Sequence, residues 1–212
     1  RKESSAASDV YKRQAGKTTF EVDENTGALK SLCLDGEELL ASPVTISLFR
    51  PATDNDNRDR MGAKLWRKAG LHTLTQKVVS LKESKTSATA QVNILNVTGK
   101  KVGDATLEYT LNHNGSLKVQ TTFQPDTTWV KSIARLGLTF EMNDTYGNVT
   151  YLGRGEHETY IDRNQSGKIG IYTTTPEKMF HYYVIPQSTG NRTDVRWVKL
   201  ADDSGKGCWI ES

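Results

Sequence analysis

The fold class is decided by residues 18–36, which read Thr18-Thr-Phe-Glu-Val-Asp-Glu-Asn-Thr-Gly-Ala-Leu-Lys-Ser-Leu-Cys-Leu-Asp-Gly36. Apolar and polar residues alternate over 18–22 and again over 28–34, which is the period of a strand with one buried face. The sequence Glu24-Asn-Thr-Gly27 is typical of a turn, and Asp35-Gly36 is typical of a hairpin connection. The stretch therefore predicts strands that follow one another through short turns.

The same pattern continues along most of the chain. Residues 44–49 predict a third strand, and His113-Asn-Gly-Ser116 predicts a tight turn between two later strands. One short helix is predicted at Ala63–Ala69, with Gly70 as its C-terminal cap. The other predicted strands lie at 74–81, 88–97, 105–111, 117–123, 133–140, 149–152, 169–173 and 195–200. Strands with turns at intervals of about 8–12 residues predict an all-β fold, a large antiparallel sandwich of two sheets.

Length and charge limit the number of domains and the kinds of partner. One all-β sandwich can reach 212 residues, and linker-like composition is confined to the N-terminus. We therefore expect a disordered or non-native leader at residues 1–16 and one domain at 17–212. The net charge is only +3, which is too small for a dedicated nucleic-acid binder. No apolar stretch approaches the roughly 18 residues of a membrane span, so neither nucleic acid nor membrane is expected as a partner.

A second run, Tyr151–Arg163, combines charged, aromatic and glycine residues that simple connections seldom need. On a strand, Glu156 and Glu158 would face the same side, and retaining glycosidases use two carboxyl groups about 5 Å apart. The alternative is that these groups bind Arg154 and Arg163, because guanidinium groups match carboxylates bidentately. We favour the second interpretation, since nothing in the sequence indicates burial that would separate the two carboxyl pKa values.

Metal binding and disulfide bonding are the other candidate roles of polar residues. The spacing of Asp54, Asp56 and Asp59 resembles a calcium loop, but glycine is absent from its sixth position and glutamate from its twelfth. A structural turn is therefore the favoured interpretation, and no metal site is expected. Cys33 and Cys208 belong to no metal-spaced set, and they either pair or remain buried free thiols, which we favour.

Five ordered motifs, spanning roughly residues 17–209, resemble the C-terminal small-chain domain (domain 5) of glycoside hydrolase family 2 β-galactosidases. They are Arg50-Pro-Ala-Thr-Asp-Asn-Asp56, Trp66 with Ala69-Gly70-Leu71, Ala134-Arg-Leu-Gly-Leu138, Gly153-Arg-Gly-Glu-His-Glu-Thr-Tyr-Ile-Asp-Arg163 and Pro186-Gln-Ser-Thr-Gly-Asn-Arg-Thr-Asp-Val-Arg-Trp197. Three positions depart from the family pattern. Glu156 and Ala134 stand where proline is usual, and Ser188 stands where glutamate is common.

The resemblance implies a fold and a role. The implied fold is a galactose-mutarotase-like super-sandwich, in agreement with the predicted strands. The implied parent enzyme hydrolyses terminal β-D-galactosides with retention, and its catalytic residues lie in a separate (β/α)₈ barrel, so no catalytic residue is expected in this chain. The family domain extends beyond the position of Ser212, so we expect a chain truncated at its C-terminus, with unpaired strand edges.

The resemblance also assigns roles to particular residues. A loop that approaches the substrate pocket is implied at Asp54, Asn55, Asp56, Asn57, Arg58 and Asp59. A hydrogen-bonded structural signature is expected at Arg154, Glu158, Tyr160, Asp162, Arg163, Asn191, Arg192, Asp194, Arg196 and Trp197.

Partners and cofactors follow from the same resemblance. The implied partners are the catalytic barrel, the other domains of the parent chain and a β-galactoside, in an enzyme that forms a homo-oligomer. No cofactor is expected in this domain, although the family often uses Mg²⁺ and Na⁺ bound mainly elsewhere. The sequence assigns no compartment, and the cytoplasm and the periplasm of a bacterium are both compatible with it.

Two other functions stay open. A stand-alone carbohydrate-binding module predicts an exposed aromatic platform, although aromatic side chains more often fill cores. An aldose 1-epimerase on the same fold predicts a catalytic histidine and glutamate facing one pocket, for which His157, His181 and Glu158 are the candidates. The candidates for the aromatic platform are Trp66, Trp129, Tyr160, Tyr182, Tyr183, Trp197 and Trp209.

Overall fold

The computed structural model describes residues 13–57 and 62–212 of the chain. They divide into two compact units, of which unit 1 spans residues 1–50 and 56–141 and unit 2 spans residues 51–55 and 142–212. Strands make up 47% of the structure and helices 8%, which confirms the predicted all-β class. Within the described residues, no helix is long and apolar enough to cross a membrane.

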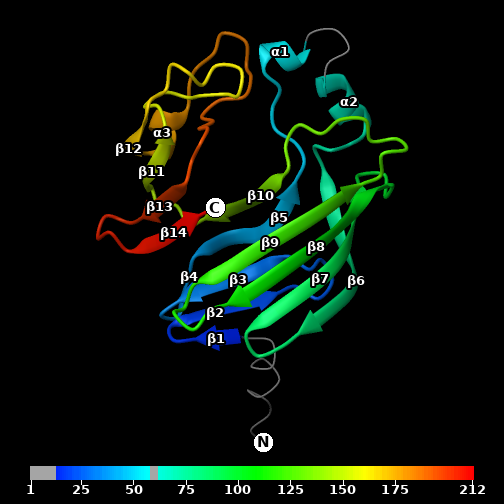
Figure 1. Ribbon diagram of the computed structural model, residues 1–212, viewed down its shortest axis with the longest axis vertical. Coiled ribbons are helices and arrows are strands. Elements are labelled where there is room, and N and C mark those ends of the chain that lie inside the picture. The colour runs from blue at the N-terminus through cyan, green and yellow to red at the C-terminus, as the bar shows by residue number, and fades with distance from the viewer. Residues whose placement is uncertain (1–12, 58–61) are drawn as a thin grey trace, which may run out of the picture. The chain divides into compact units, whose positions relative to one another are not determined.

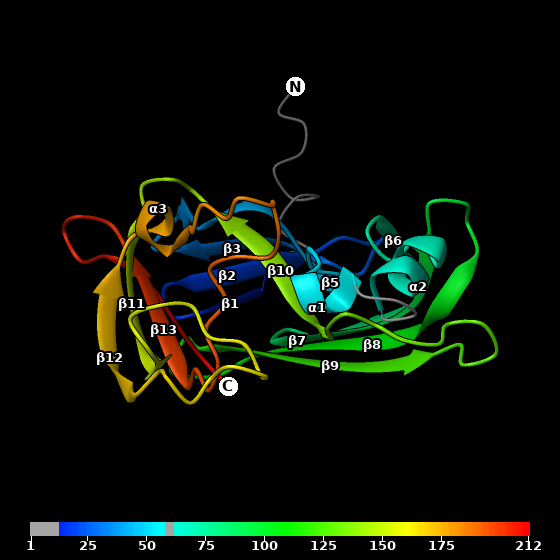
Figure 2. The same cartoon turned by 90° about the horizontal axis from the view of Figure 1, so that it is seen from above.

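Unit 1 contains two sheets, which Figure 2 shows as two layers. The first sheet has the order β1-β2-β3-β5-β10, with β4 paired to β3, and the second has the order β6-β7-β8-β9 (Figure 1). The strands of the first sheet are β1 (Arg13–Ala15), β2 (Thr18–Val22), β3 (Leu29–Leu34), β4 (Glu37–Glu38), β5 (Leu40–Ser47) and β10 (Gly137–Met142). Those of the second are β6 (Leu74–Glu83), β7 (Ser87–Asn96), β8 (Lys101–Leu111) and β9 (Leu117–Pro125).

The core of unit 1 lies between these sheets. Every second side chain of β8 from Ala105 to Leu111 is buried, as the alternation of apolar and polar residues requires. From the first sheet, Phe20 packs against Tyr109 with 6.3 Å between ring centroids. The Tyr109 hydroxyl donates a hydrogen bond to the backbone oxygen of Gly27 (2.9 Å), which satisfies a polar group inside an apolar core.

The turn predicted at residues 24–27 also connects the two sheets. The Asp23 carboxylate accepts hydrogen bonds from the backbone N–H groups of Asn25 (2.9 Å) and Thr26 (2.8 Å). Gly27 follows with φ +69°, and a β-carbon at this position would lie 2.7 Å from the β-carbon of Ala90 on β7. Only glycine can combine this backbone conformation with so close an approach.

Two other local predictions are confirmed. Asp35 and Gly36 have φ values of 57° and 82°, the left-handed pair of a type I′ hairpin that joins β3 to β4. Helix α2 (Gly62–Lys68) ends at Gly70, where φ is +71°. The N–H of Gly70 donates to Arg67 and that of Leu71 to Trp66, which is the hydrogen-bond pattern of a Schellman cap.

Unit 2 is built on a four-stranded sheet with the order β12-β11-β13-β14. Its strands are β11 (Asn148–Arg154), β12 (Ile169–Thr174), β13 (Trp197–Ala201) and β14 (Gly207–Glu211), and α3 (Pro176–Met179) follows β12. A single turn of helix, α1 (Asp54–Asn57), lies at the junction of the units in the sequence. The sequence predicts one helix, whereas the described residues contain three, because α1 and α3 are too short to show a helical period.

The expected leader requires a correction at its C-terminal end. Arg13–Ala15 form β1, which pairs with β2, so disorder does not extend to residue 16. Arg13 is buried, pairs with Glu83, lies over the ring of Phe20 and donates to the backbone oxygen of Ser87. An arginine can bury its stem while its charge is satisfied, which polar composition does not reveal. Residues 1–12 lie outside the described part of the chain.

The thiols of Cys33 and Cys208 are free, as favoured from the sequence, although both are half-buried rather than fully buried. Burial is the main influence on the Cys208 thiol and raises its pKa. The strand predicted at 133–140 begins only at Gly137. The residues before it are irregular, and the N–H of Ala134 donates to the backbone oxygen of Leu48.

The turn at Asp23 should make stability depend on pH. Burial works to raise the pKa of Asp23, but hydrogen bonds from Thr26 and Asn25 outweigh it and hold the pKa below its ordinary value. The contribution of Asp23 to the free energy of unfolding is therefore present above the unfolded pKa of about 3.9. It is lost as the pH falls through the lower pKa of the folded state. The variant Asp23→Asn keeps an oxygen acceptor but does not titrate. Urea unfolding at about pH 6 and about pH 3 should show a smaller loss of stability in this variant. An equal loss would contradict the assignment.

The close approach at Gly27 should be measurable by substitution. Gly27→Ala should lower the free energy of unfolding by about 3 kcal/mol, since overpacking adds to the cost of a left-handed alanine. Gly36→Ala is the matched control, because Gly36 also has positive φ but has nothing within 4 Å of an added β-carbon. It should cost only about 1 kcal/mol in urea unfolding. Equal costs at the two positions would show that the turn does not press on β7.

Candidate functional site

The two long motifs of unit 2 form one hydrogen-bonded structure, although neither motif is mostly regular secondary structure. Thr159 is fully buried, and its N–H donates to the backbone oxygen of Asn191 (2.9 Å). The side-chain amide of Asn191 donates back to the Thr159 oxygen at 2.7 Å. The Thr159 hydroxyl then accepts from the N–H of Thr193 at 2.9 Å. This reciprocal pairing fixes the first motif against the second.

Glu158 is the most buried carboxylate of the site, with a relative exposure of 8%. Its Oε1 accepts hydrogen bonds from Arg163 and from the hydroxyl of Tyr183. Its Oε2 accepts from the N–H of Gly190 (2.9 Å) and the hydroxyl of Thr189 (3.2 Å). Both oxygens are thus occupied by protein donors, as a buried carboxylate requires.

Two further arginines connect the loops to the sheet. Arg154, the last residue of β11, pairs with Asp194 and donates to the backbone oxygen of Gly167 at 3.0 Å. Asp194 has φ 53°, a conformation that aspartate tolerates better than most residues. Arg192 donates to the Tyr151 hydroxyl (2.8 Å), and it also donates to the backbone oxygen of Glu156 (2.8 Å).

The Asp-Asn-Asp motif joins the same structure within unit 2. The N–H of Ser188 donates to the backbone oxygen of Ala52 (3.0 Å), and the amide of Asn55 donates to Asp162 (2.9 Å). The hydroxyl oxygen of Ser188 also accepts from the buried hydroxyl of Tyr160 at 3.1 Å. Three motifs that are far apart in the sequence therefore meet in one place.

The loop implied to approach the substrate pocket is only partly described. Asp54–Asn57 form α1, and Asp56 pairs with Arg50 at 2.5 Å within unit 1. Arg50 lies over the ring of Trp66, 5.4 Å from its centroid. Asp54 contacts Gln187, whose side-chain oxygen accepts its N–H at 3.3 Å. Arg58 and Asp59 lie outside the described residues.

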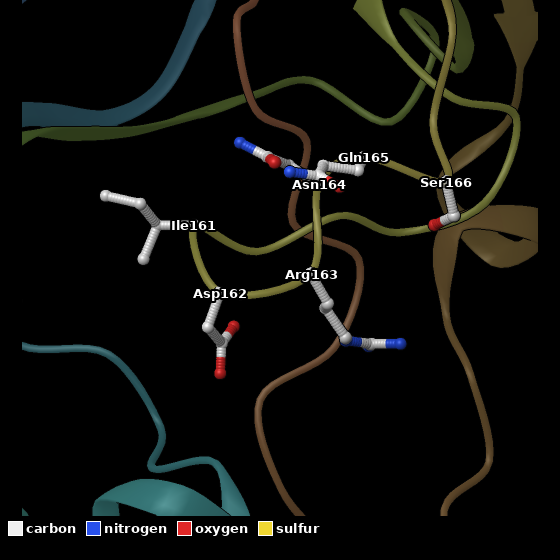
Figure 3. Close-up of a pocket in the computed structure, with 6 residues that line it drawn as sticks. All are labelled: Ile161, Asp162, Arg163, Asn164, Gln165 and Ser166. Carbon is white, nitrogen blue, oxygen red and sulfur yellow. The ribbon is translucent and has the colours of Figure 1, made fainter.

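A shallow hollow of about 320 Å³ lies on the first motif and the loop that follows it. It is lined by Ile161, Asp162, Arg163, Asn164, Gln165 and Ser166. In Figure 3, Asp162 and Arg163 project to one side of this loop and Asn164 to the other. Arg163 and Asp162 are already bonded to Glu158 and Asn55, so the hollow offers polar contact but no free acid–base pair.

The strand geometry considered for Glu156 and Glu158 is wrong. Strand β11 ends at Arg154, and Gly155 turns the chain with φ +74°. As a result Glu156 is exposed while Glu158 is buried, so the two carboxyl groups do not share a strand face. The favoured alternative holds for Glu158, which pairs with Arg163, whereas Arg154 takes Asp194 instead.

Most residues of the expected signature belong to the network described above. Arg196 and Trp197 do not join this network through their polar side-chain groups. Arg196 is exposed, and only its backbone N–H donates, to the oxygen of Leu152. Trp197 is the first residue of β13, and its ring stacks on Trp209. Sequence reasoning missed Thr159 and Tyr183 as members. Thr159 could have been suspected from its place between signature residues, whereas Tyr183 lies 25 positions from its partner Glu158 and carries no local signal.

Histidines and carboxylates of the site do not form a metal centre. His157 shares a hydrogen bond with Ser166 (3.0 Å), and the ring of His181 packs on Tyr183 at 4.4 Å. Within residues 13–57 and 62–212, no group of three or more His, Cys, Asp or Glu residues could hold a metal ion.

Comparison with known proteins shows the family to which the chain belongs. A family model described as the β-galactosidase small chain matches residues 14–211. The chain belongs to the β-galactosidase small-chain family. This membership confirms the resemblance drawn from the five motifs. It also includes Gln14 and Ala15, which supports the place of β1 in the domain.

Relatives of this small-chain domain come from bacteria and a yeast. The chain is 31% identical over 196 residues to a β-galactosidase of Priestia megaterium, a match that covers 89% of the chain. It is 28% identical over 190 residues to β-galactosidase BgaC of Bifidobacterium adolescentis, covering 87%, and 29% identical over 195 residues to a β-galactosidase of Kluyveromyces lactis, covering 85%. The matched segment spans only 18% of the length of each of these relatives.

The central carboxylate should be essential for the stability of the domain. Glu158→Gln removes the charge that Arg163 and three other donors share, and should lower the free energy of unfolding by about 2 kcal/mol. The matched control is Glu156→Gln, two residues away and exposed, which should change it by less than about 0.5 kcal/mol. Differential scanning calorimetry of both variants measures the two changes in stability. If the two variants are equally stable, the Glu158 network does not hold unit 2 together.

Proposed function

We propose that this chain is the non-catalytic C-terminal β-sandwich domain of a β-galactosidase, where it shapes the mouth of the active site and supports assembly. The observation that carries the proposal is the small-chain family match over residues 14–211, in a chain that spans 18% of its relatives. The proposed partners are the catalytic barrel and other domains of the parent chain, a β-galactoside substrate, and further copies of the parent. Any Mg²⁺ or Na⁺ of the parent would bind mainly outside this domain.

The chemistry of the described carboxyl groups supports a non-catalytic role. A glycosidase needs a general acid whose pKa is raised by its surroundings. Four described carboxyl groups instead have a lowered pKa: burial works to raise the pKa of Asp23 and Glu38 but is outweighed, and in all four hydrogen bonds from hydroxyl and N–H groups favour the charged form. These groups are Asp23, Glu38, Asp126 and Asp202. Glu158 has both oxygens occupied by protein donors, so this carboxylate is not free to attack a sugar.

Anchoring of the Asp-Asn-Asp motif supports a role beside the substrate pocket. Asn55 is bonded to Asp162, and Asp56 is paired with Arg50, so the start of the proposed cleft loop is fixed at two points. Binding loops are usually mounted on rigid scaffolds, and these two bonds tie Asn55 and Asp56 to the scaffolds of their own units.

One observation favours a second candidate, a carbohydrate-binding module. Trp197 and Trp209 stack at 4.1 Å with 25° between their planes, and Trp209 is 54% exposed. Exposed aromatic rings of this kind can receive the apolar face of a sugar. Calorimetric titration with galactose and lactose tests it, and the absence of heat would remove this candidate. The aldose epimerase alternative gains no such support, because Glu158 is fully engaged.

The proposal is tested by complementation. The β-galactosidase of Priestia megaterium is prepared without the segment that matches this chain over 196 residues. The 212-residue chain alone should not hydrolyse o-nitrophenyl β-D-galactoside, and its addition to the shortened enzyme should restore hydrolysis in a saturable way. The control is the same chain after irreversible heat unfolding.

Two results would contradict the proposal. Hydrolysis by the isolated chain that disappears in Glu158→Gln would show a catalytic centre in this domain. Failure of the folded chain to raise the activity of the shortened enzyme would show that it does not support assembly.

A further inference from the structure

Apolar side chains gather on one exposed segment of unit 2. Residues 180–186 read Phe-His-Tyr-Tyr-Val-Ile-Pro and follow α3, the short helix labelled in Figure 1. The exposures are 53% for Phe180, 88% for Tyr182, 102% for Val184 and 66% for Ile185. These four residues are called the 180–185 surface below. Single exposed apolar side chains are ordinary, whereas four of them within one short segment favour an interaction site.

The composition around the 180–185 surface is that of an interface core. From Met179 to Asn191 the chain contains no Asp, Glu, Lys or Arg, although these types make up 25% of all residues. Cores of protein interfaces are depleted of charge and enriched in aromatic residues and methionine. A solvent-facing loop has no reason to avoid charge over such a length, so this segment is suited to contact with protein.

The segment is also held in shape before any partner binds. The hydroxyl of Tyr183 donates a hydrogen bond to Glu158 and accepts one from Arg163. The Arg163 side chain is labelled in Figure 3. The N–H of His181 donates to the hydroxyl of Thr189 at 2.8 Å. Phe180 packs edge-on against Tyr182 at 4.8 Å. A surface ordered in advance loses less conformational entropy on binding.

We propose that the 180–185 surface is where this chain docks onto the rest of a β-galactosidase polypeptide. The inference rests on the proposed function and adds the contact surface to it. The relatives carry more than four-fifths of their length outside the matched segment, so a large body of protein is available to cover it. Val184 and Ile185 have no flat ring for a sugar to stack on, which favours an apolar protein surface as the partner.

The experiment measures how much chain restores half of the maximal activity of the shortened Priestia megaterium enzyme. Val184→Asp places a carboxylate in the proposed contact and should raise this concentration at least about tenfold. The saturating activity should stay at the wild-type level, because the residue is proposed to dock and not to line the pocket. Val97→Asp is the matched control, since Val97 is 65% exposed in the turn after β7 and should leave both quantities unchanged.

Each outcome separates this inference from the proposed function. Restoration by Val184→Asp at the wild-type concentration overturns the docking surface but leaves the proposed function intact. A lower saturating activity without a change in half-saturation also overturns it, because the residue then acts within the cleft. Self-association of the wild-type chain in sedimentation that Val184→Asp abolishes, with restoration unaffected, assigns the surface to a second copy and overturns it as well. If the wild-type chain restores nothing, the proposed function itself fails.

Discussion

The carboxylate of Glu158 is the interaction on which the rest of unit 2 depends. Taking a carboxylate out of water is costly, and the cost is offset only when protein donors replace the lost water. Here the donors come from separate parts of the chain, namely Arg163 of the same motif, Tyr183 beyond α3, and Thr189 with Gly190 in the second motif. Because these segments must converge to satisfy one side chain, their irregular paths are determined by polar geometry.

The two units reach order by different physical means. Unit 1 places an apolar core between two sheets, with Phe20, Tyr109 and neighbours at almost no exposure. Unit 2 has one four-stranded sheet, and much of its remaining chain is irregular and tied by side-chain hydrogen bonds such as those of Thr159 and Arg192. Hydrophobic packing tolerates exchange of similar side chains, whereas a polar network is sensitive to loss of a single member. Substitutions should therefore be accepted more readily in unit 1.

Local chemistry explains which features could be predicted from the sequence. The turn at Asp35-Gly36 and the cap at Gly70 require positive φ, and each follows from the residues beside it. The strand period predicted most of the sheets for the same reason. The place of Tyr183 could not be predicted, because its partner Glu158 is 25 residues away and the segment between them has no repeating pattern. The strand considered for residues 156–158 does not form because Gly155 turns the chain after β11, and an alternating pattern carries no signal for such a turn.

The bonding of two side chains to one carboxylate, that of Glu158, has a consequence for how the sequence of this domain can evolve. Arg163 and Tyr183 both bond the same oxygen of Glu158, so neither can be replaced without altering the electrostatic balance of the other. Across descendants of this domain, these positions should change together or not at all. The motif that identifies the family would then be preserved by mutual dependence among its side chains, independently of any contact with substrate.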